Sequence, residues 1–301
     1  MNPCQKYFIL GLLIASIGFA KAVQIESVVL PNTQIRKIHS KFTGQNYRIY
    51  INVPATYKVN SSKKYPSLFM LDADYSFALA KQITEHLSDR KRIPETLVFG
   101  VAYDGPPNYR LNRTRDYTPT RVLGGGYGPE FEKHSGGAPQ FADFLEKELV
   151  PFLKKEFKLS DSKTLVGHSY GGLFSAWMLI SRPKIFESYI IVSPSLWYDH
   201  GFIFKQKQPI EEIKGKAFFG VGSRETTKYN TEHPMLEETQ RFARLLESKK
   251  SSDFKVAFVV FADENHDTVF PAALTRGIAF VLGKKLGLKA INKSVLAERI
   301  F

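Results

Sequence analysis

The sequence predicts an α/β fold with a mostly parallel central sheet and helices on both faces. Beyond Pro66, six apolar runs of strand length alternate with segments of helical periodicity. Continuous apolar runs separated by helices indicate parallel strands that are buried on both faces. The chain shows no internal repeat and no linker rich in Gly, Pro or Ser, so residues 23–301 are expected to form a single domain.

The elements of this sheet can be placed one by one. The apolar runs lie at 67–72, 96–102, 163–169, 189–194, 216–222 and 254–261, and three alternating stretches at 25–30, 35–39 and 47–53 predict strands at the sheet edge. Helices are expected over 77–87, 139–157, 170–180, 235–246 and 269–286. Pro151 should kink the second helix or mark its last turns, because proline lacks a backbone N–H. Two long stretches, 103–138 and 197–212, are expected to be irregular loops, which in compact domains are often functional.

The first 22 residues have the pattern of a signal peptide. Lys6 precedes an apolar run over 8–20, and the small-x-small pattern Ala20, Lys21, Ala22 follows. The run is short for a membrane span, so we expect cleavage after Ala22 and a periplasmic or secreted protein; an uncleaved anchor is the alternative. Cys4 is the only cysteine, so the mature chain would have no disulfide and no thiolate zinc site.

The charge balance is strongly basic. Forty-two Lys and Arg against 29 Asp and Glu give a net charge of +13, which favours acidic partners. The basic residues are scattered in pairs with no long block, so nucleic acid is not an expected partner. No cofactor or metal is expected either, because His233 and His266 have no third ligand at a useful spacing.

The stretch "KTLVGHSYGGLFSAWML" at 163–179 carries the strongest chemical signal. A GxSxG pattern alone is weak, but here an apolar strand precedes it and a helical apolar pattern follows it. This context places Ser169 on a sharp strand-to-helix turn, where Gly167 and Gly171 let the strand and helix pass closely. We predict that Ser169 is a nucleophile; the alternative is a glycine-rich turn with an idle serine.

A serine nucleophile needs a base and a group that orients the base. In the chain order of α/β-hydrolases (serine, acid, histidine), the base follows the last strand, and His266 holds that place in "VVFADENHDTVF". Glu225, just beyond "FFGVGS", is the predicted acid. The competing possibilities are Glu232 and a Ser–His dyad oriented by backbone, and for His266 a surface loop histidine. Three carboxylates beside the histidine are read as ordinary loop residues: Asp263, Glu264 and Asp267.

The negative charge that develops in acyl transfer requires an oxyanion hole. One donor is expected to be the backbone N–H of Tyr170, the residue after the nucleophile. The second should come from the loop after "SLFMLD", and thus from Ala73 or Asp74. Each such donor typically lowers the barrier by about 3 kcal/mol.

With these residues the sequence resembles the esterase D-like branch of the α/β-hydrolases, which also contains feruloyl esterases. Within this branch it most resembles the trilactone siderophore esterases. The resemblance spans most of the mature chain and rests on "YPSLFMLDAD", "NRTRDYTPT", "GGAPQFADFLEKELVPFLKKEF", "LVGHSYGGLFSAWMLISRPKIFESYIIVSPSLWYD" and "ENHDTVFPAALTRGI", in that order. It implies an α/β-hydrolase catalytic domain over 23–301 with Ser169 as nucleophile and His266 as base. Relatives of this group hydrolyse the ester linkages of cyclic catecholate siderophores.

A ferric catecholate is anionic and aromatic, which suggests how this chain would bind one. Arg113 and Arg115 could contact anionic oxygens and stack on rings, and Trp197 with Tyr198 could form a stacking wall. For each arginine, the competing role is to hold the loop through backbone carbonyls. The sequence thus predicts an exported serine carboxylesterase acting on a small-molecule ester. The alternatives are a feruloyl or carbohydrate acyl esterase, an acyltransferase, and a binding protein on a hydrolase scaffold.

Overall fold

The computed structural model describes residues 27–59, 62–206, 210, 213–229, 233–249 and 251–283. The chain divides into two compact units, Met1–Pro31 and Asn32–Phe301, and the strands and helices that are described belong to the second. The predicted signal peptide over 1–22 lies outside the described residues. Among the described residues, no helix has the length and apolar character needed to cross a bilayer.

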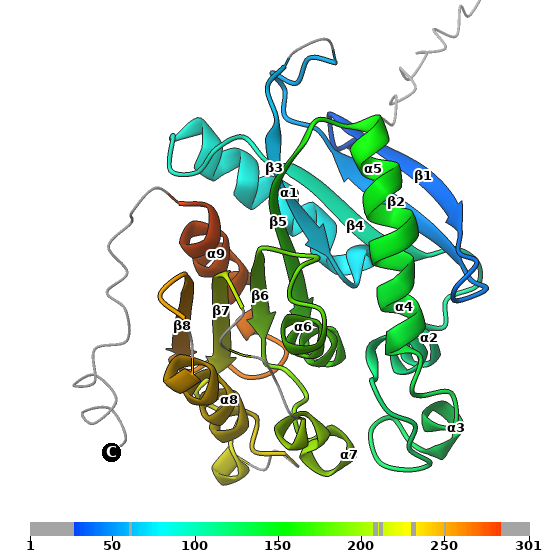
Figure 1. Cartoon of the computed structure of the whole chain (residues 1–301), viewed down its shortest axis with the longest axis vertical. Helices are drawn as coiled ribbons and strands as arrows, with labels where there is room; N and C mark the ends of the chain where they lie inside the picture. Colours follow the sequence, from blue (N-terminus) through cyan, green and yellow to red (C-terminus); the bar gives the residue numbers. More distant parts are fainter. Residues whose placement is uncertain are drawn as a thin grey trace, which may run out of the picture. The chain divides into compact units, whose positions relative to one another are not determined.

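An eight-stranded sheet forms the centre of the second unit, in the order β1-β2-β4-β3-β5-β6-β7-β8 (Figure 1). β1 and β2 pair antiparallel, β2 joins β4 antiparallel, and the pairs from β4 to β8 are parallel. The mostly parallel sheet predicted from the sequence is therefore confirmed. The strands are β1 (Thr33–His39), β2 (Asn46–Asn52), β3 (Tyr65–Met70), β4 (Leu97–Tyr103), β5 (Leu159–His168), β6 (Ser188–Val192), β7 (Gly215–Gly222) and β8 (Phe254–Phe261).

One predicted edge strand is wrong in its described part. Residues 27–30 adopt no regular structure, and residues 25–26 lie outside the described residues. Val28 is 99% exposed and Val29 is 75% exposed, so these apolar side chains are not buried as those of a half-buried strand would be. The other two edge strands are confirmed as β1 and β2.

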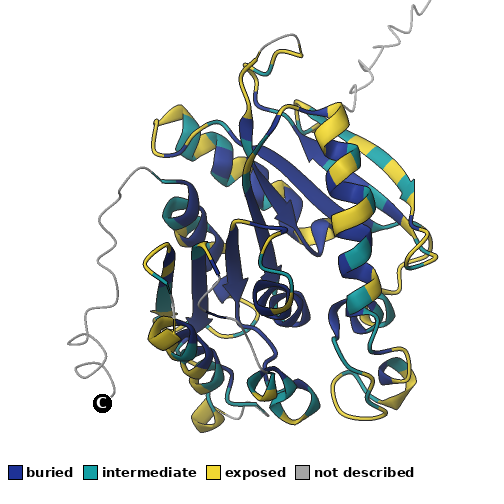
Figure 2. Ribbon diagram, in the orientation of Figure 1, coloured by how far each residue is buried: buried dark blue, intermediate teal, exposed yellow. Residues whose placement is uncertain are grey.

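Helices cover both faces of the sheet, and two apolar cores result. Along β3, Phe69 belongs to one core and Leu68 and Met70 to the other, because successive strand side chains point to opposite faces. α1 (Ala73–Asp89) and α9 (Val269–Leu282) pack on the Leu68 side, and α4, α5, α6 and α8 on the Phe69 side. The central strands are buried over most of their length, as Figure 2 shows. The bounds on the Phe69 side are α4 (Ala138–Phe144), α5 (Val150–Glu156), α6 (Tyr170–Ser181) and α8 (Met235–Lys249).

The predicted helix at 139–157 is continuous in path but not in hydrogen bonding. Between α4 and α5 the backbone forms a π-helical turn, η1 (Leu145–Leu149), just before Pro151. Proline has no N–H to donate and its ring crowds the carbonyl four residues earlier. The wider turn accommodates both effects, which explains the irregularity expected at this residue.

The two stretches predicted as irregular loops contain short helices, which corrects that prediction. The first holds α2 (Tyr109–Tyr117) and α3 (Pro129–Glu132), and the second holds α7 (Tyr198–Gly201) and η2 (Phe202–Lys205). A further short turn, η4 (Thr227–Tyr229), follows β7. α2 is strongly polar in sequence, and its buried residues include Arg113, Thr114 and Asp116. The sequence of α2 shows no apolar periodicity because the buried face of this helix is largely polar.

Candidate active site

Ser169 lies on a tight turn between β5 and α6. Its backbone has φ 60° and ψ −120°, a strained conformation for a residue with a side chain. The turn is fixed on both sides, because the Ser169 N–H donates to the Val192 carbonyl at 3.1 Å and the Ser195 N–H donates to the Ser169 carbonyl at 3.1 Å. The strand-turn-helix context predicted for Ser169 is thus confirmed, while its chemical role remains a prediction.

Gly167 shows why this turn needs glycine. A Cβ atom at Gly167 would lie 2.1 Å from the Gly171 carbonyl oxygen and 2.6 Å from Ser175 Oγ. The first turn of α6 therefore passes directly over the end of β5. A side chain at this position would push the helix away from the strand and move Ser169 with it.

His266 and Glu225 lie at the ends of adjacent strands and contact each other. Glu225 follows β7 and His266 lies in the loop between β8 and α9; His266 Nδ1 is 2.8 Å from Glu225 Oε2. The glutamate is fully buried, whereas the histidine side chain is 34% exposed. This arrangement orients the imidazole through Nδ1 and leaves Nε2 for a reacting group.

The other oxygen of Glu225 is also held. Ser193 Oγ donates to Oε1 at 2.6 Å, and the Gly222 N–H donates to it at 2.8 Å. A fully buried carboxylate with three donors is fixed in position as well as solvated by the protein. The competing acid Glu232 lies outside the described residues. Among the described residues, no group of three His, Cys, Asp or Glu side chains is placed to bind a metal.

His168 packs against His266 with ring centroids 4.6 Å apart, and it also contacts Phe270 at 5.3 Å. Burial lowers the pKa of His168 well below its usual value, and the nearby His266 and Arg113 act in the same direction. A neutral His168 ring therefore lies beside His266 without competing for the proton that His266 would carry.

The predicted oxyanion donors lie at the first turns of two helices. Tyr170 is the first residue of α6, and Ala73 and Asp74 begin α1. Backbone N–H groups in the first turn of a helix have no partner within the helix, which makes them available to an anion. The Asp74 side chain is occupied elsewhere, because Tyr50 donates to it at 3.1 Å.

A second buried glutamate, Glu132, was not anticipated from the sequence. Its Oε1 accepts a hydrogen bond from Tyr170 Oη at 2.9 Å and one from the Tyr127 N–H at 3.1 Å. Tyr198 Oη lies 3.5 Å from Oε2. Glu132 thus ties the 103–138 segment to α6 and α7. A lone charged residue in a glycine-rich stretch carries no pattern that distinguishes it from a surface residue.

The structure corrects the substrate-binding role predicted for Arg113. Its side chain is 2% exposed, and Nε and Nη2 donate to Asp72 Oδ1 and Oδ2 at 2.9 and 3.3 Å. Nη2 also donates to the His168 carbonyl at 3.0 Å, and Nη1 donates to Tyr127 Oη. The guanidinium is fully engaged inside the protein. The alternative role, holding a loop through a backbone carbonyl, fits the contact of Nη2 with the His168 carbonyl. The sequence does not predict the ion pair with the buried carboxylate of Asp72.

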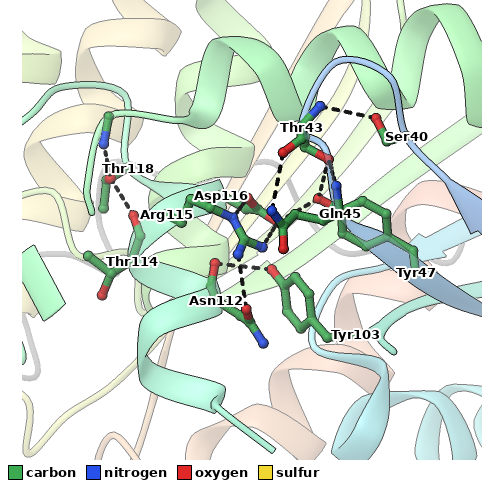
Figure 3. Close-up of polar contacts among 11 residues, drawn as sticks. Ser40, Thr43, Gln45, Tyr47, Tyr103, Asn112, Thr114, Arg115, Asp116 and Thr118 are labelled. Atoms are coloured by element: carbon green, nitrogen blue, oxygen red, sulfur yellow. Dashed lines mark hydrogen bonds and ion pairs between the residues drawn. The ribbon is translucent and has the colours of Figure 1, made fainter. Parts of the chain in front are cut away.

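Arg115 is also paired within the protein rather than free for a ligand. Its Nε and Nη2 donate to Asp116 at 2.7 and 3.0 Å, and Nη1 donates to Asn112 Oδ1 at 3.1 Å (Figure 3). Asp116 in turn accepts a hydrogen bond from Tyr47 Oη at 2.8 Å. These contacts join α2 to strand β2, so Arg115 has a structural position and the predicted contact with substrate is corrected.

Trp197 borders a cavity of about 330 Å³ between α7 and α8, lined also by His200, Gly201, Phe204, Lys205, Glu238 and Arg241. One face of the indole stacks on His233, with centroids 3.7 Å apart and planes inclined by 13°. The indole also lies 6.1 Å from the Tyr170 ring. Tyr198 is buried and its Oη donates to the Thr120 carbonyl, so it braces the adjacent loop. The cavity is therefore lined by aromatic and basic groups together with Glu238. Its indole is a neighbour of the ring of Tyr170, the residue that follows Ser169.

The chain is similar to known esterases in sequence. The family described as "Putative esterase" matches residues 40–280 of the chain. The ferri-bacillibactin esterase of Bacillus subtilis is 27% identical over 84% of this chain and 90% of its own length. The apo-salmochelin esterase of Escherichia coli is 26% identical over 82% of this chain and 78% of its own.

A solved structure gives the same result for the fold. The BES protein of Bacillus cereus aligns with a TM-score of 0.76 and 25% identity, covering 87% of this chain and all of that one. The α/β-hydrolase fold predicted from the sequence is therefore confirmed. The chain belongs to the "Putative esterase" family, and it is an esterase that acts on carboxylic ester bonds.

Proposed function

We propose that this protein is an exported serine esterase that cleaves the ester bonds of anionic, aromatic trilactone siderophores. Its reacting groups are Ser169, His266 and Glu225. The observation that carries the proposal is the contact of His266 Nδ1 with the buried Glu225 carboxylate, at the same sheet edge as the strained turn of Ser169. These features provide a base, its orienting group and a partly exposed nucleophile.

The reaction begins with attack of Ser169 Oγ on the ester carbonyl carbon while the hydroxyl proton passes to Nε2 of His266. The second imidazole proton stays on Nδ1, facing Glu225, which stabilises the imidazolium. The carbonyl oxygen becomes an oxyanion and accepts hydrogen bonds from the backbone N–H groups of Tyr170 and Ala73 or Asp74. The carbon–oxygen bond then breaks, and His266 gives its proton to the departing alkoxide.

Water completes the cycle by reversing these proton transfers. His266 takes a proton from water as the hydroxide oxygen attacks the acyl carbon of the Ser169 ester. The second oxyanion collapses, the bond to Ser169 Oγ breaks, and His266 returns the proton to the serine. The released product carries a carboxylate, so each turnover adds one negative charge to the substrate fragment.

Three observations support an anionic, aromatic substrate. The relatives named above act, by their names, on ferri-bacillibactin and apo-salmochelin. The cavity beside Trp197 presents an indole together with Lys205 and Arg241, which suit a planar anionic ring. Without Lys6 and Lys21 the mature chain keeps a net charge of +11 (13 − 2), which acts in the same direction over a longer range. We therefore assign Trp197 to substrate binding in this proposal.

The experiment is hydrolysis of purified ferric and iron-free bacillibactin by the mature chain over 23–301, with products separated by mass. Linear fragments are expected from the wild-type protein and not from Ser169→Ala. Ser181→Ala serves as the matched control, because Ser181 is an exposed serine at the far end of the same helix. Selective turnover of feruloyl esters, or transfer of the acyl group to an added alcohol, would instead overturn the siderophore assignment.

Export is tested separately by fractionating cells that produce the full chain. The expected result is a mature protein that begins at Val23 and is released with the periplasm or the medium. A chain that keeps residues 1–22 and sediments with membranes would contradict the exported part of the proposal.

A further inference from the structure

Arg113 occupies an unusual position between two loops that meet at the sheet edge. It projects from α2, is almost completely buried, and bonds two acceptors that belong to different loops. One is the carboxylate of Asp72, in the loop after β3; the other is the carbonyl of His168, at the end of β5. A single planar group therefore bridges the two loops directly.

Each of these acceptors lies one or two residues before a proposed donor of the oxyanion hole. Asp72 is followed by Ala73, and His168 is followed by Ser169 and Tyr170. Asp72 itself has a left-handed backbone, φ 52° and ψ 50°, and its N–H donates to Tyr117 Oη at 3.2 Å. Aspartate adopts this region more readily than most residues, and the contacts with Tyr117 and Arg113 fix Asp72 in it.

The burial of the ion pair between Arg113 and Asp72 is not by itself evidence that the pair stabilises the fold. Desolvation of a buried ion pair offsets much of its attraction, and apolar residues of similar size often serve equally well. What the guanidinium supplies is geometry, because its planar fork fixes several acceptors at set distances and angles. A lysine in its place has one ammonium group and cannot reproduce the fork.

Further contacts link Arg113 and Asp72 to the first residues of α6. Arg113 Nη1 donates to Tyr127 Oη, and the Tyr127 ring lies 5.1 Å from that of Tyr170. The Gly171 backbone also passes close to Asp72, since a Cβ atom there would lie 3.1 Å from Asp72 Oδ2. The start of α6 and the start of α1 thus contact the same pair of charged groups.

We propose that Arg113 is a positioning residue that sets the separation of the two backbone amides which bind the oxyanion. This inference rests on the proposed esterase mechanism and adds a role to it. Because the oxyanion forms only in the transition state, a misplaced amide should lower kcat and leave KM nearly unchanged.

The test compares Arg113→Lys and Asp72→Asn with the wild-type protein, using a small neutral p-nitrophenyl ester. We expect kcat to fall by roughly 30- to 300-fold in each variant, by the scale of a lost oxyanion donor, with KM within threefold. The double variant should be little worse than either single one, because both changes break the same bridge. Thermal unfolding gives the folded fraction to which kcat is normalised.

Arg115→Lys is the matched control. Arg115 is on the same helix, also pairs with an aspartate, and contacts neither loop, so its variant should keep kcat within twofold. If Arg113→Lys does not fold, the isosteric Asp72→Asn carries the test. Unchanged kcat in the folded variants, or a rise in KM with kcat intact, would overturn the positioning role. Complete inactivity of the wild-type protein would instead refute the proposed function.

Discussion

Glu225 and Glu132 both have fully buried carboxylates, but the groups that donate to them differ. Glu225 accepts from Ser193, the Gly222 amide and the ring of His266, so one of its partners can gain and lose a proton. Glu132 faces tyrosine hydroxyls and the Tyr127 amide, none of which changes protonation near neutral pH. Burial alone therefore does not separate the carboxylate that we propose orients the base from a structural one. The nature of the donor does.

The largest expected effect is that of Glu225→Gln. The amide nitrogen would face Nδ1 of His266 and favour the wrong tautomer, so kcat should fall by roughly 10³- to 10⁴-fold. The unfolding temperature should change by only a few degrees, because the amide oxygen can still accept from Ser193 and Gly222. Steady-state kinetics with a p-nitrophenyl ester and thermal unfolding measure both. A loss of activity below tenfold would remove Glu225 from the mechanism.

Glu132→Ala should lower the stability of the protein strongly and its kcat only slightly, the opposite of Glu225→Gln. Removing this carboxylate leaves the Tyr170 hydroxyl and the Tyr127 amide without their acceptor, which should lower the free energy of unfolding by about 2 to 4 kcal/mol. The kcat of the folded protein should fall less than tenfold, because no reacting atom contacts Glu132. Urea unfolding and kinetics on the same preparation separate the two effects. Loss of activity on the scale of Glu225→Gln would contradict the comparison.

A third glutamate, Glu238, is expected to have the smallest effect of the three, and this effect is on the pH dependence of stability. Glu238 is half-buried beside the Trp197 cavity, and its Oε2 has no hydrogen-bond partner among the described residues. Burial raises its pKa to about 7, opposed by Arg241 and assisted by Glu237. Between its unfolded pKa of 4.5 and about 7, the folded state holds more protons than the unfolded state. Stability from this group is therefore lost as pH rises through that window.

Glu238→Gln removes that titration. Relative to wild type, the variant should gain about 1 kcal/mol of stability between pH 5 and pH 8, allowing for solvent screening at a half-buried site. Thermal unfolding across this pH range measures the gain, which corresponds to a few degrees. The other ionisable groups lining the cavity, His200, Lys205 and Arg241, are common to both proteins and cancel in the difference. A difference that stays constant with pH would contradict the raised pKa.

The comparison also explains what the sequence could and could not predict. The strands, the turn at Ser169 and the place of Glu225 after β7 follow from local patterns, because chain order fixes which loops meet at the sheet edge. The contacts of Glu132 with Tyr170 and of Asp72 with Arg113 join residues 38 and 41 positions apart. No periodicity relates such residues, and polar α2 lacks the apolar stripe that predicts a helix. The sequence therefore predicts that Arg113 and Arg115 contact the substrate, whereas both pair with aspartates inside the protein.

We propose that His266 activates Ser169, and a fluorophosphonate probe reports this activation. Intact mass and peptide mapping of the wild-type protein should show one adduct, located on Ser169. The adduct should be absent in Ser169→Ala and form far more slowly in His266→Ala. An unlabelled wild-type protein, or an adduct on another serine, would contradict the account.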